Sequence, residues 1–445
     1  MFDSLISLLG GNNTGKNAIK AILLAGTLSV IVRIFGFIKE STIAYYFGTS
    51  EYVDFYVLAL IFVTFFVQPI GGAISTLLTQ KYIEIVKVYS SKVAGHIYIK
   101  SLLLGILCIC IISVIQSFLL QIPRIEAWFI SKFSYINLNY IYILMPIGIL
   151  STISLINGSI LMAKEQFKTH SLLPIFVHFT TITFLIFAPK EYVFEFLLIG
   201  TLFGFFLELI ISKFCLRKIF LKLDFNKIKE EGREFNKIIK SLPKMIISAT
   251  ILGSSLIIDQ IMAMLAGEGA VAMINFGNKV PLGLISIITI WGTVLYPTFI
   301  QYVTASRYNT LRKSFLRFST ISFFLFFIIC GFISFFSDSL IKILFEHGAF
   351  LAKDTIMVAN IQILYLMLVP LFIVSMICMR VINALENSGI YLLGNVLLIV
   401  INIILNLYLI PLYGVIGAPL ATLISYGFIT VFWIYVTNQL VKAKM

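Results

Sequence analysis

The stretch that decides the fold runs from Arg33 to Asp54 and reads RIFGFIKESTIAYYFGTSEYVD. It begins inside an apolar run that carries Arg33, Lys39 and Glu40 at membrane depth. The chain is expected to turn at residues 48–50, and Asp54 stands at the start of the next apolar run. Charge at membrane depth is costly and usually faces a water-filled cavity or a partner. We therefore expect this helix to line a cavity that accepts an anion rather than to face lipid.

The composition of the whole chain is typical of a membrane protein. Of its 445 residues, 60% are hydrophobic and 12% are charged, and the mean hydropathy is +1.02. A soluble domain is nearer half apolar and a quarter charged. Apolar runs long enough to cross a bilayer recur from end to end. The sequence therefore predicts an all-α polytopic membrane protein.

The apolar runs predict about 12 transmembrane helices, because each crossing needs roughly 20 residues. Six precede the longest basic connection and six follow it. We expect an N-terminal six-helix bundle at 1–216, a basic cytoplasmic linker at 217–242 and a C-terminal six-helix bundle at 243–445. The predicted spans are 18–47, 53–80, 95–120, 138–163, 171–188, 192–216, 243–265, 270–303, 315–336, 355–385, 390–411 and 414–440.

Two spans in corresponding halves share a pattern. Pro146 is followed by Ser151, and about half a chain later Pro370 is followed by Ser375 at the same spacing. Internal repeats of this kind are common in transporters. The pattern favours two pseudo-symmetric bundles. A separate cluster of helix breakers, Pro69 to Gly72, predicts a bend in the second span.

The net charge is +13, and its distribution predicts the orientation. Most of the 33 Lys and Arg residues lie at the termini and in alternate connections, which are cytoplasmic by the positive-inside rule. Both termini are thus expected in the cytoplasm, and the charge needs no nucleic acid to explain it. The opposite connections hold only Arg124, Lys132, Lys190, Lys342 and Lys353.

The linker itself is rich in Lys and Arg. Its charge favours an amphipathic helix on anionic membrane lipid; a regulatory or partner site is the alternative.

No pattern in the sequence predicts an enzyme. There is no Gly-rich phosphate loop followed by Lys-Ser or Lys-Thr. The four histidines and five cysteines have no metal-ligand spacing, so we predict neither a metal site nor a cofactor. His178 lies inside a span, where a packing role competes with a proton relay.

Arg33 and Glu40 are about two helical turns apart and share one face. Two interpretations remain open. Arg33 and Glu40 could form a structural pair, or Arg33 and Lys39 could bind a phosphate-rich headgroup, since Arg offers a planar fork and Lys a point charge.

Several stretches resemble the MurJ/MviN-type lipid II flippases, which belong to the multidrug/oligosaccharidyl-lipid/polysaccharide flippase superfamily. The resemblance covers essentially the whole chain. It is carried by RIFGFIKE at 33–40, FG at 47–48, VDFY at 53–56, NKVPLG at 278–283, LFEHGAF at 344–350, KDT at 353–355, and NIILNLYLIP at 402–411 followed by Gly414, Gly417 and Ala418.

The resemblance implies two six-helix bundles forming a V around a central cationic cavity. It further implies a flippase that moves a polyprenyl-pyrophosphate-linked saccharide from the inner to the outer leaflet of the bacterial cytoplasmic membrane by alternating access. Arg33, Lys39, Asp54 and Lys279 then have a substrate-binding role by position. Lys39 and Lys279 stand where the family usually has arginine.

Some positions depart from the family. The usual Lys and Arg of its second span are replaced near Ile61 and Val67, and the stretch at 386–389 lacks its basic residue. The family also carries two further spans that build a groove for the lipid tail. A flippase for O-antigen or exopolysaccharide repeat units therefore stays open. A multidrug or metabolite antiporter needs acidic groups for organic cations, and the deep charges of this chain lean cationic.

Without a nucleotide site, an ion gradient is expected to supply the work. Moving one charge through the membrane potential yields about 2.3 kcal/mol per 100 mV. Asp54, Glu208 and Asp259 are the candidates for coupling to Na⁺ or H⁺. Asp259 ranks last because Lys279 is a candidate partner for it.

Overall fold

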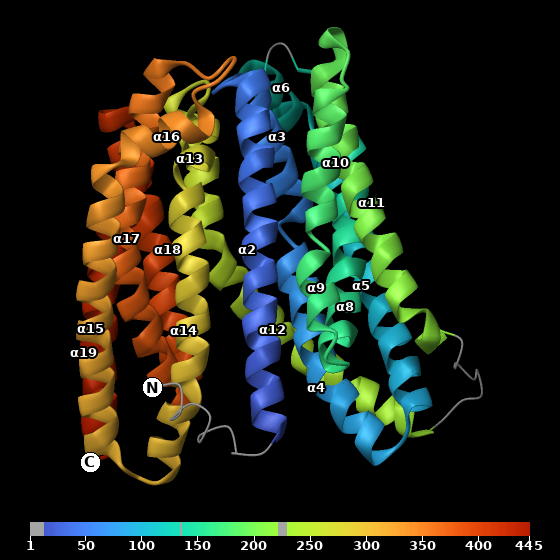
Figure 1. Ribbon diagram of the computed structural model, residues 1–445, viewed down its shortest axis with the longest axis vertical. Coiled ribbons are helices and arrows are strands. Elements are labelled where there is room, and N and C mark those ends of the chain that lie inside the picture. The colour runs from blue at the N-terminus through green and yellow to red at the C-terminus, as the bar shows by residue number, and fades with distance from the viewer. Residues whose placement is uncertain (1–12, 134–135, 221–228) are drawn as a thin grey trace. The chain divides into compact units, whose positions relative to one another are not determined.

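The computed structural model describes residues 13–133, 136–220 and 229–445, and this part of the chain contains helices and no strand (Figure 1). The α-helices are α2 Asn13–Phe47, α3 Glu51–Thr64, α4 Ala73–Val88, α5 Ser91–Leu120, α6 Pro123–Lys132, α7 Tyr140–Leu144, α8 Pro146–Ala163, α9 Phe167–Leu172, α10 Ile175–Ile186, α11 Val193–Phe220, α12 Lys229–Ala263, α13 Ala270–Gly277, α14 Lys279–Thr304, α15 Tyr308–Phe335, α16 Ser337–Phe345, α17 Ala352–Ala384, α18 Ser388–Tyr413 and α19 Gly417–Lys442. A π-helix, η1, covers Val67–Gly72, and 3₁₀ turns cover Lys190–Tyr192, Met264–Ala266 and Gly414–Ile416.

The chain forms two compact units. Unit 1 consists of Met1–Thr42 and Ala59–Thr250, and unit 2 consists of Ile43–Leu58 and Ile251–Met445, as far as these residues are described. The helices α2, α3 and α12 each continue from one unit into the other. The corner between α2 and α3 packs with unit 2, although its place in the chain suggested the first bundle.

Eight helical segments of the described chain are long and apolar enough to cross a membrane: Glu51–Val86, Val93–Leu120, Tyr140–Ala163, Phe167–Ile186, Lys190–Arg217, Tyr308–Phe335, Ala352–Ala384 and Gly389–Lys442. The all-α, multi-pass class predicted from the sequence is therefore confirmed. The count of about 12 spans and the V-shaped pair of bundles stay predictions.

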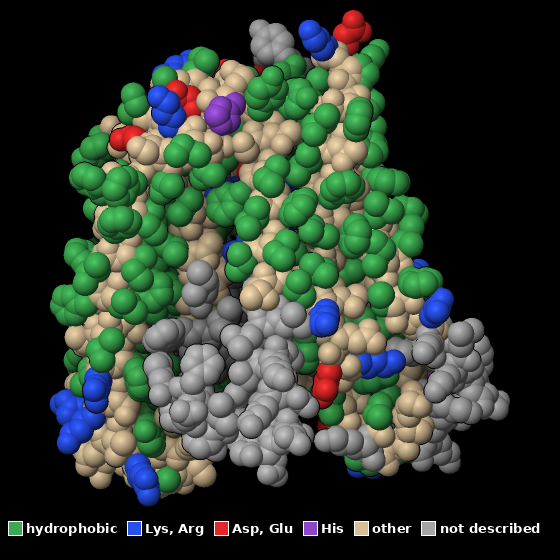
Figure 2. Space-filling view, viewed as in Figure 1, with side chains coloured by type: hydrophobic (Ala, Val, Ile, Leu, Met, Phe, Trp, Pro, Cys, Tyr) green, Lys and Arg blue, Asp and Glu red, His purple; other side chains and the backbone are tan. Residues whose placement is uncertain are grey.

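Exposed apolar side chains mark the lipid-facing surfaces. On α5 they include Leu103, Leu107, Ile111, Val114 and Phe118, which are three or four residues apart and so lie on one helix face. Figure 2 shows hydrophobic side chains over the middle of the visible helices, with Lys and Arg mainly toward their ends. This is the distribution that a bilayer imposes on the helices that cross it.

Each unit is built around one buried helix. In unit 1, α8 packs against α4, α5 and α11, and Asn157 of α8 accepts a hydrogen bond from Tyr98 at 2.7 Å and donates one to Ser212 at 2.8 Å. In unit 2, α17 packs against α13, α14, α15, α16 and α19. These helices contain Pro146 and Pro370, the two prolines of the internal pattern.

The predicted bend at Pro69 to Gly72 coincides with η1, a π-helix. Proline lacks the backbone N–H that a regular α-helical turn needs, and the wider turn lets the chain pass this point. Gly71 lies against α8, since a Cβ placed on it would be 3.3–3.4 Å from side-chain atoms of Leu155 and Thr152. Single π turns inside α-helices occur often at functional sites.

The basic linker differs from its predicted form where it is described. Residues 221–228 lie outside the described chain, and α12 begins at Lys229. Ile238 and Leu242 are buried in the core of unit 1, while the Glu234 carboxylate pairs with Lys81 of α4 at 3.5 Å. The apolar side of this segment therefore faces protein rather than lipid.

Close packing of α18 on α19 gives a first testable prediction. A Cβ placed on Gly394 would lie 2.2 Å from ring atoms of Trp433, which is 1% exposed. We expect Gly394→Ala to destabilise the protein by about 1–3 kcal/mol, because the indole must leave its site. Thermal unfolding in detergent measures this loss.

Gly427→Ala on α19 is the matched control, since nothing lies within 4 Å of the added Cβ. Its melting temperature should equal or exceed that of the wild type, because alanine favours a helix over glycine. Equal melting temperatures for the two variants would contradict the packing of Gly394 on Trp433.

Candidate ion and headgroup sites

The cations of α2 have different surroundings within unit 1. Lys39 Nζ lies 3.0 Å from Glu40 Oε1, and both side chains are nearly buried. Arg33 is exposed and forms no ion pair with any residue that the structure describes. The structural pairing of Arg33 with Glu40 is therefore wrong, and the Arg33 guanidinium is available for an anionic ligand.

Asp54 belongs to unit 2, where it binds backbone amides. One carboxylate oxygen accepts from the Gly269 N–H and the other from the Ala272 N–H, both at 2.7 Å. These amides belong to the first turn of α13, whose free N–H groups favour a negative charge. Asp54 is 4% exposed. Each oxygen accepts one backbone N–H, so the geometry supports an anchoring role, while its predicted part in substrate or ion binding stays a prediction.

The corner that contains Asp54 also contacts the LFEHGAF stretch inside unit 2. The Ala349 N–H donates to the Tyr45 carbonyl at 2.8 Å, and the Thr49 hydroxyl donates to Asp354 at 2.8 Å. Gly48 has φ +57°, and a Cβ on it would lie 2.5 Å from the Ala349 carbonyl oxygen. The two most specific stretches of the resemblance thus meet and hold this corner in place.

Asp259 of α12 is fully buried in unit 2 and is reached by four neutral donors. Asn402 and Asn406 donate to one oxygen at 3.1 and 3.2 Å. The Tyr365 hydroxyl donates to the other oxygen at 3.2 Å. The Thr422 hydroxyl also donates to that oxygen. Asp259 forms no ion pair within the described residues, so the expected pairing with Lys279, a half-buried residue at the start of α14, is absent.

In this structure all four side chains donate to the Asp259 carboxylate. The amide and hydroxyl oxygens of the same groups are hard ligands of the kind that small cations take. Turning either asparagine amide would direct its oxygen to the same point. The sequence analysis ranked Asp259 last among the acids and missed its neighbours. The available signal was Asn402 and Asn406, two amides one helical turn apart inside an apolar span.

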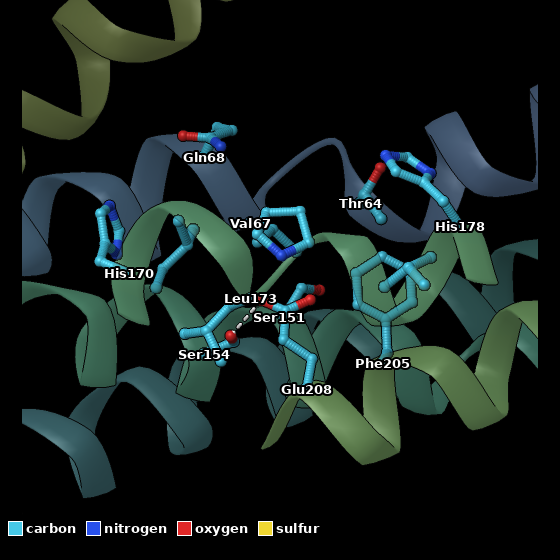
Figure 3. Close-up of a pocket in the computed structure, with 13 residues that line it drawn as sticks. Thr64, Val67, Gln68, Ser151, Ser154, His170, Leu173, His178, Phe205 and Glu208 are labelled. Carbon is cyan, nitrogen blue, oxygen red and sulfur yellow. Dashed lines mark hydrogen bonds between the residues drawn. The ribbon is translucent and has the colours of Figure 1, made fainter. Parts of the chain in front are cut away.

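Glu208 lies in a different environment, within unit 1. It borders a cavity of about 380 Å³ that is lined by residues of α3, η1, α8, α9, α10 and α11 (Figure 3). Ser154 of α8 donates to Glu208 Oε1 at 2.5 Å. His170 and His178 lie at opposite sides of the view. Sequence reasoning selected Glu208 but did not connect it with Ser154 or with either histidine.

Long apolar helices that bury acidic and amide side chains are typical of a multi-pass membrane transport protein. The family model described as "Lipid II flippase MurJ" matches residues 43–444. The chain therefore belongs to the lipid II flippase MurJ family, whose members are transporters and not enzymes.

The chain is also similar to a curated relative, and its fold is similar to solved structures. A probable lipid II flippase MurJ of Buchnera aphidicola subsp. Acyrthosiphon pisum is 24% identical over 92% of this chain and 81% of its own. The fold is similar to a lipid II flippase MurJ in an inward closed conformation, with TM-score 0.72 and 20% identity, covering 93% of this chain and 87% of the other. An inward-facing MATE family transporter of the MOP superfamily has TM-score 0.73 at 12% identity, covering 95% and 98%.

The Asp54 anchor gives a second prediction. Asp54→Asn keeps the size of the side chain but removes the charge and one acceptor facing the α13 amides. A buried charge-assisted hydrogen bond contributes about 1.5–3 kcal/mol. We expect the free energy of unfolding to fall by about that amount, with no ligand present, and thermal unfolding in detergent measures the loss.

Glu268→Gln changes a neighbouring exposed acid and should have the melting temperature of the wild type. An unchanged melting temperature for Asp54→Asn would argue against the anchor.

Proposed function

We propose that the protein is a flippase that carries a polyprenyl-pyrophosphate-linked saccharide of the lipid II kind from the inner to the outer leaflet of the bacterial cytoplasmic membrane. It would work by alternating access, with both termini in the cytoplasm. The observation that carries this proposal is the match of residues 43–444 to the lipid II flippase MurJ family. The membrane lipids and the lipid-linked substrate are the partners that this activity requires.

The physical task is to move a large polar headgroup past hydrocarbon roughly 30 Å thick. Cations on apolar helices lower that cost because they compensate a pyrophosphate. Arg33, exposed and without an ion pair in the described chain, is the strongest candidate. Lys39 in unit 1 and Lys279 in unit 2 are the other predicted cations, and their part in binding the headgroup stays a prediction.

Complementation tests the substrate. Expression of this chain in a bacterium depleted of its own lipid II flippase should restore growth. Rescue of a strain that lacks its O-antigen or exopolysaccharide flippase, without rescue of the first strain, would instead favour the alternative substrate class.

A flipping assay with purified protein in proteoliposomes tests a third prediction. Arg33→Ala should reduce flipping about 10- to 100-fold, because a charge-assisted bidentate contact to phosphate is lost. The amount of folded protein should not change, since Arg33 holds no ion pair among the described residues. Arg33→Lys should restore flipping only in part, because a point charge does not reproduce the planar fork.

Arg317→Ala removes another exposed cation, on α15, and serves as the control that should keep full activity. Normal flipping by Arg33→Ala, or a loss explained entirely by misfolding, would refute the headgroup role of Arg33.

The transport is proposed to be coupled to Na⁺ or H⁺, with Asp259 as the ion-binding acid of unit 2. This proposal is supported by the neutral hydrogen-bond donors that surround the fully buried Asp259 carboxylate. Such a charge is costly unless a proton or a cation joins it.

The fourth prediction concerns Asp259→Asn. The amide removes the charge and turns one acceptor oxygen into an N–H₂ donor, which the Tyr365 and Thr422 hydroxyls can accept by rotating. We therefore expect a folded protein that no longer responds to the driving ion. Flipping in proteoliposomes, with the Na⁺ gradient, the proton gradient and the potential imposed one at a time, measures that response. Asp338→Asn, at an exposed acid of α16, is the control. If the wild-type protein still flips its substrate after both gradients and the membrane potential are collapsed, the proposed coupling is wrong.

A further inference from the structure

The cavity of unit 1 is a second place where a buried acid lacks a charged partner. We propose that this cavity is a proton-binding site, in which Glu208 takes up and releases the proton. Its contribution to driving transport rests on the proposed function, whereas the binding of the proton does not.

The first step is the charge balance at Glu208. Its side chain is 9% exposed, and its recorded hydrogen bond comes from the neutral hydroxyl of Ser154. No Lys or Arg is among the residues that line the cavity, and Glu208 forms no ion pair within the described chain. A carboxylate in these surroundings is costly unless something neutralises it.

The second step identifies what neutralises the acid. Metal cations of the hard type need several oxygen ligands at once. Here a single hydroxyl reaches the Glu208 carboxylate, and much of the lining is apolar, including Val67, Leu155, Leu173, Val177 and Phe205. The described residues contain no group of three or more His, Cys, Asp or Glu that could hold a metal. A proton needs no such shell.

The third step concerns the other titratable groups. His170 of α9 and His178 of α10 line the same cavity. The His170 ring lies against Gly158, and its Nδ1 is buried without a hydrogen-bond partner in the described structure. An imidazole exchanges protons near neutral pH more readily than any other side chain. Two such groups on the walls of the cavity that Glu208 borders suit a site through which protons enter and leave.

The remaining helices packed against α11 add no charge to the cavity. Tyr140 of α7 is engaged with Glu195 at 2.5 Å, and Lys190 and Glu191 of the 3₁₀ turn are exposed. The helix α8 contributes only Ser151, Ser154 and Leu155 to the lining.

The fourth step is access. One water molecule occupies about 30 Å³ in the liquid, so a cavity of about 380 Å³ has room for several. Val67 and Gln68 of η1, together with Thr64 at the end of α3, supply part of its wall, and single π turns of this kind occur often at functional sites. Water in this space would connect the acid with the imidazoles.

The test uses the purified full chain and dicyclohexylcarbodiimide, which reacts with carboxyl groups that are protonated in apolar surroundings. The carboxylic acid adds across a C=N bond of the reagent, and the adduct rearranges to a stable N-acylurea without losing an atom. Mass spectrometry then locates the modified residue. We expect modification of Glu208 that falls as the pH rises and that is unchanged when Na⁺ replaces K⁺ at constant ionic strength.

Two serines provide matched variants. Ser154→Ala removes the hydroxyl that donates to Glu208 and should move the midpoint of labelling up by about one pH unit, since that bond favours the charged carboxylate. Ser151→Ala changes a serine of the same cavity whose hydroxyl donates to the Ile147 carbonyl instead, so its midpoint should match the wild type.

No labelling of Glu208 at any pH, labelling that does not depend on pH, or equal midpoints for the two serine variants would each overturn the proposal. Protection by Na⁺ would do the same and would assign the site to a metal cation. The assay contains no substrate and measures no transport, so its result is independent of whether the protein is a flippase.

Discussion

Removing a carboxylate from water costs several kcal/mol unless a partner compensates its charge, and the helices of this protein are apolar along most of their length. Three buried acids meet that cost in three ways. Asp54 accepts hydrogen bonds from the free amides at a helix terminus. Asp259 accepts them from neutral side-chain amides and hydroxyls. Glu208 borders a cavity. The positive end of α13 compensates the charge of Asp54, whereas no described residue forms an ion pair with either of the other two acids.

This difference distinguishes the surroundings of Asp54 from those of the other two acids. The Asp54 carboxylate holds the corner of α2 and α3 within unit 2, together with Thr49 and the LFEHGAF stretch. Asp259 and Glu208, each in a different unit, are the acids whose surroundings can respond to an ion.

The sequence predicted the features that depend on one helix at a time. Apolar runs located the helical segments, Pro69 to Gly72 marked the irregular turn that became η1, and the charged motif of α2 led to the correct family. It could not predict which helix faces meet. Asn402, Asn406 and Thr422 converge on Asp259 from α18 and α19, and Ser154 meets Glu208 from α8. Linear spacing within one helix carries no information on such neighbours, so Lys279 was assigned to Asp259 in error.

The lining of the unit 1 cavity also bears on inhibition. Its volume of about 380 Å³ falls within the range of small-molecule sites, which are mostly apolar with a few polar groups that fix orientation. A compact lipophilic amine would bring its own positive charge to Glu208 and fill the apolar space beside Phe205 and Leu173. Such a compound would compete with the proton rather than with the saccharide, and its potency would rise as the medium becomes more alkaline, up to the pH at which the amine itself loses its charge.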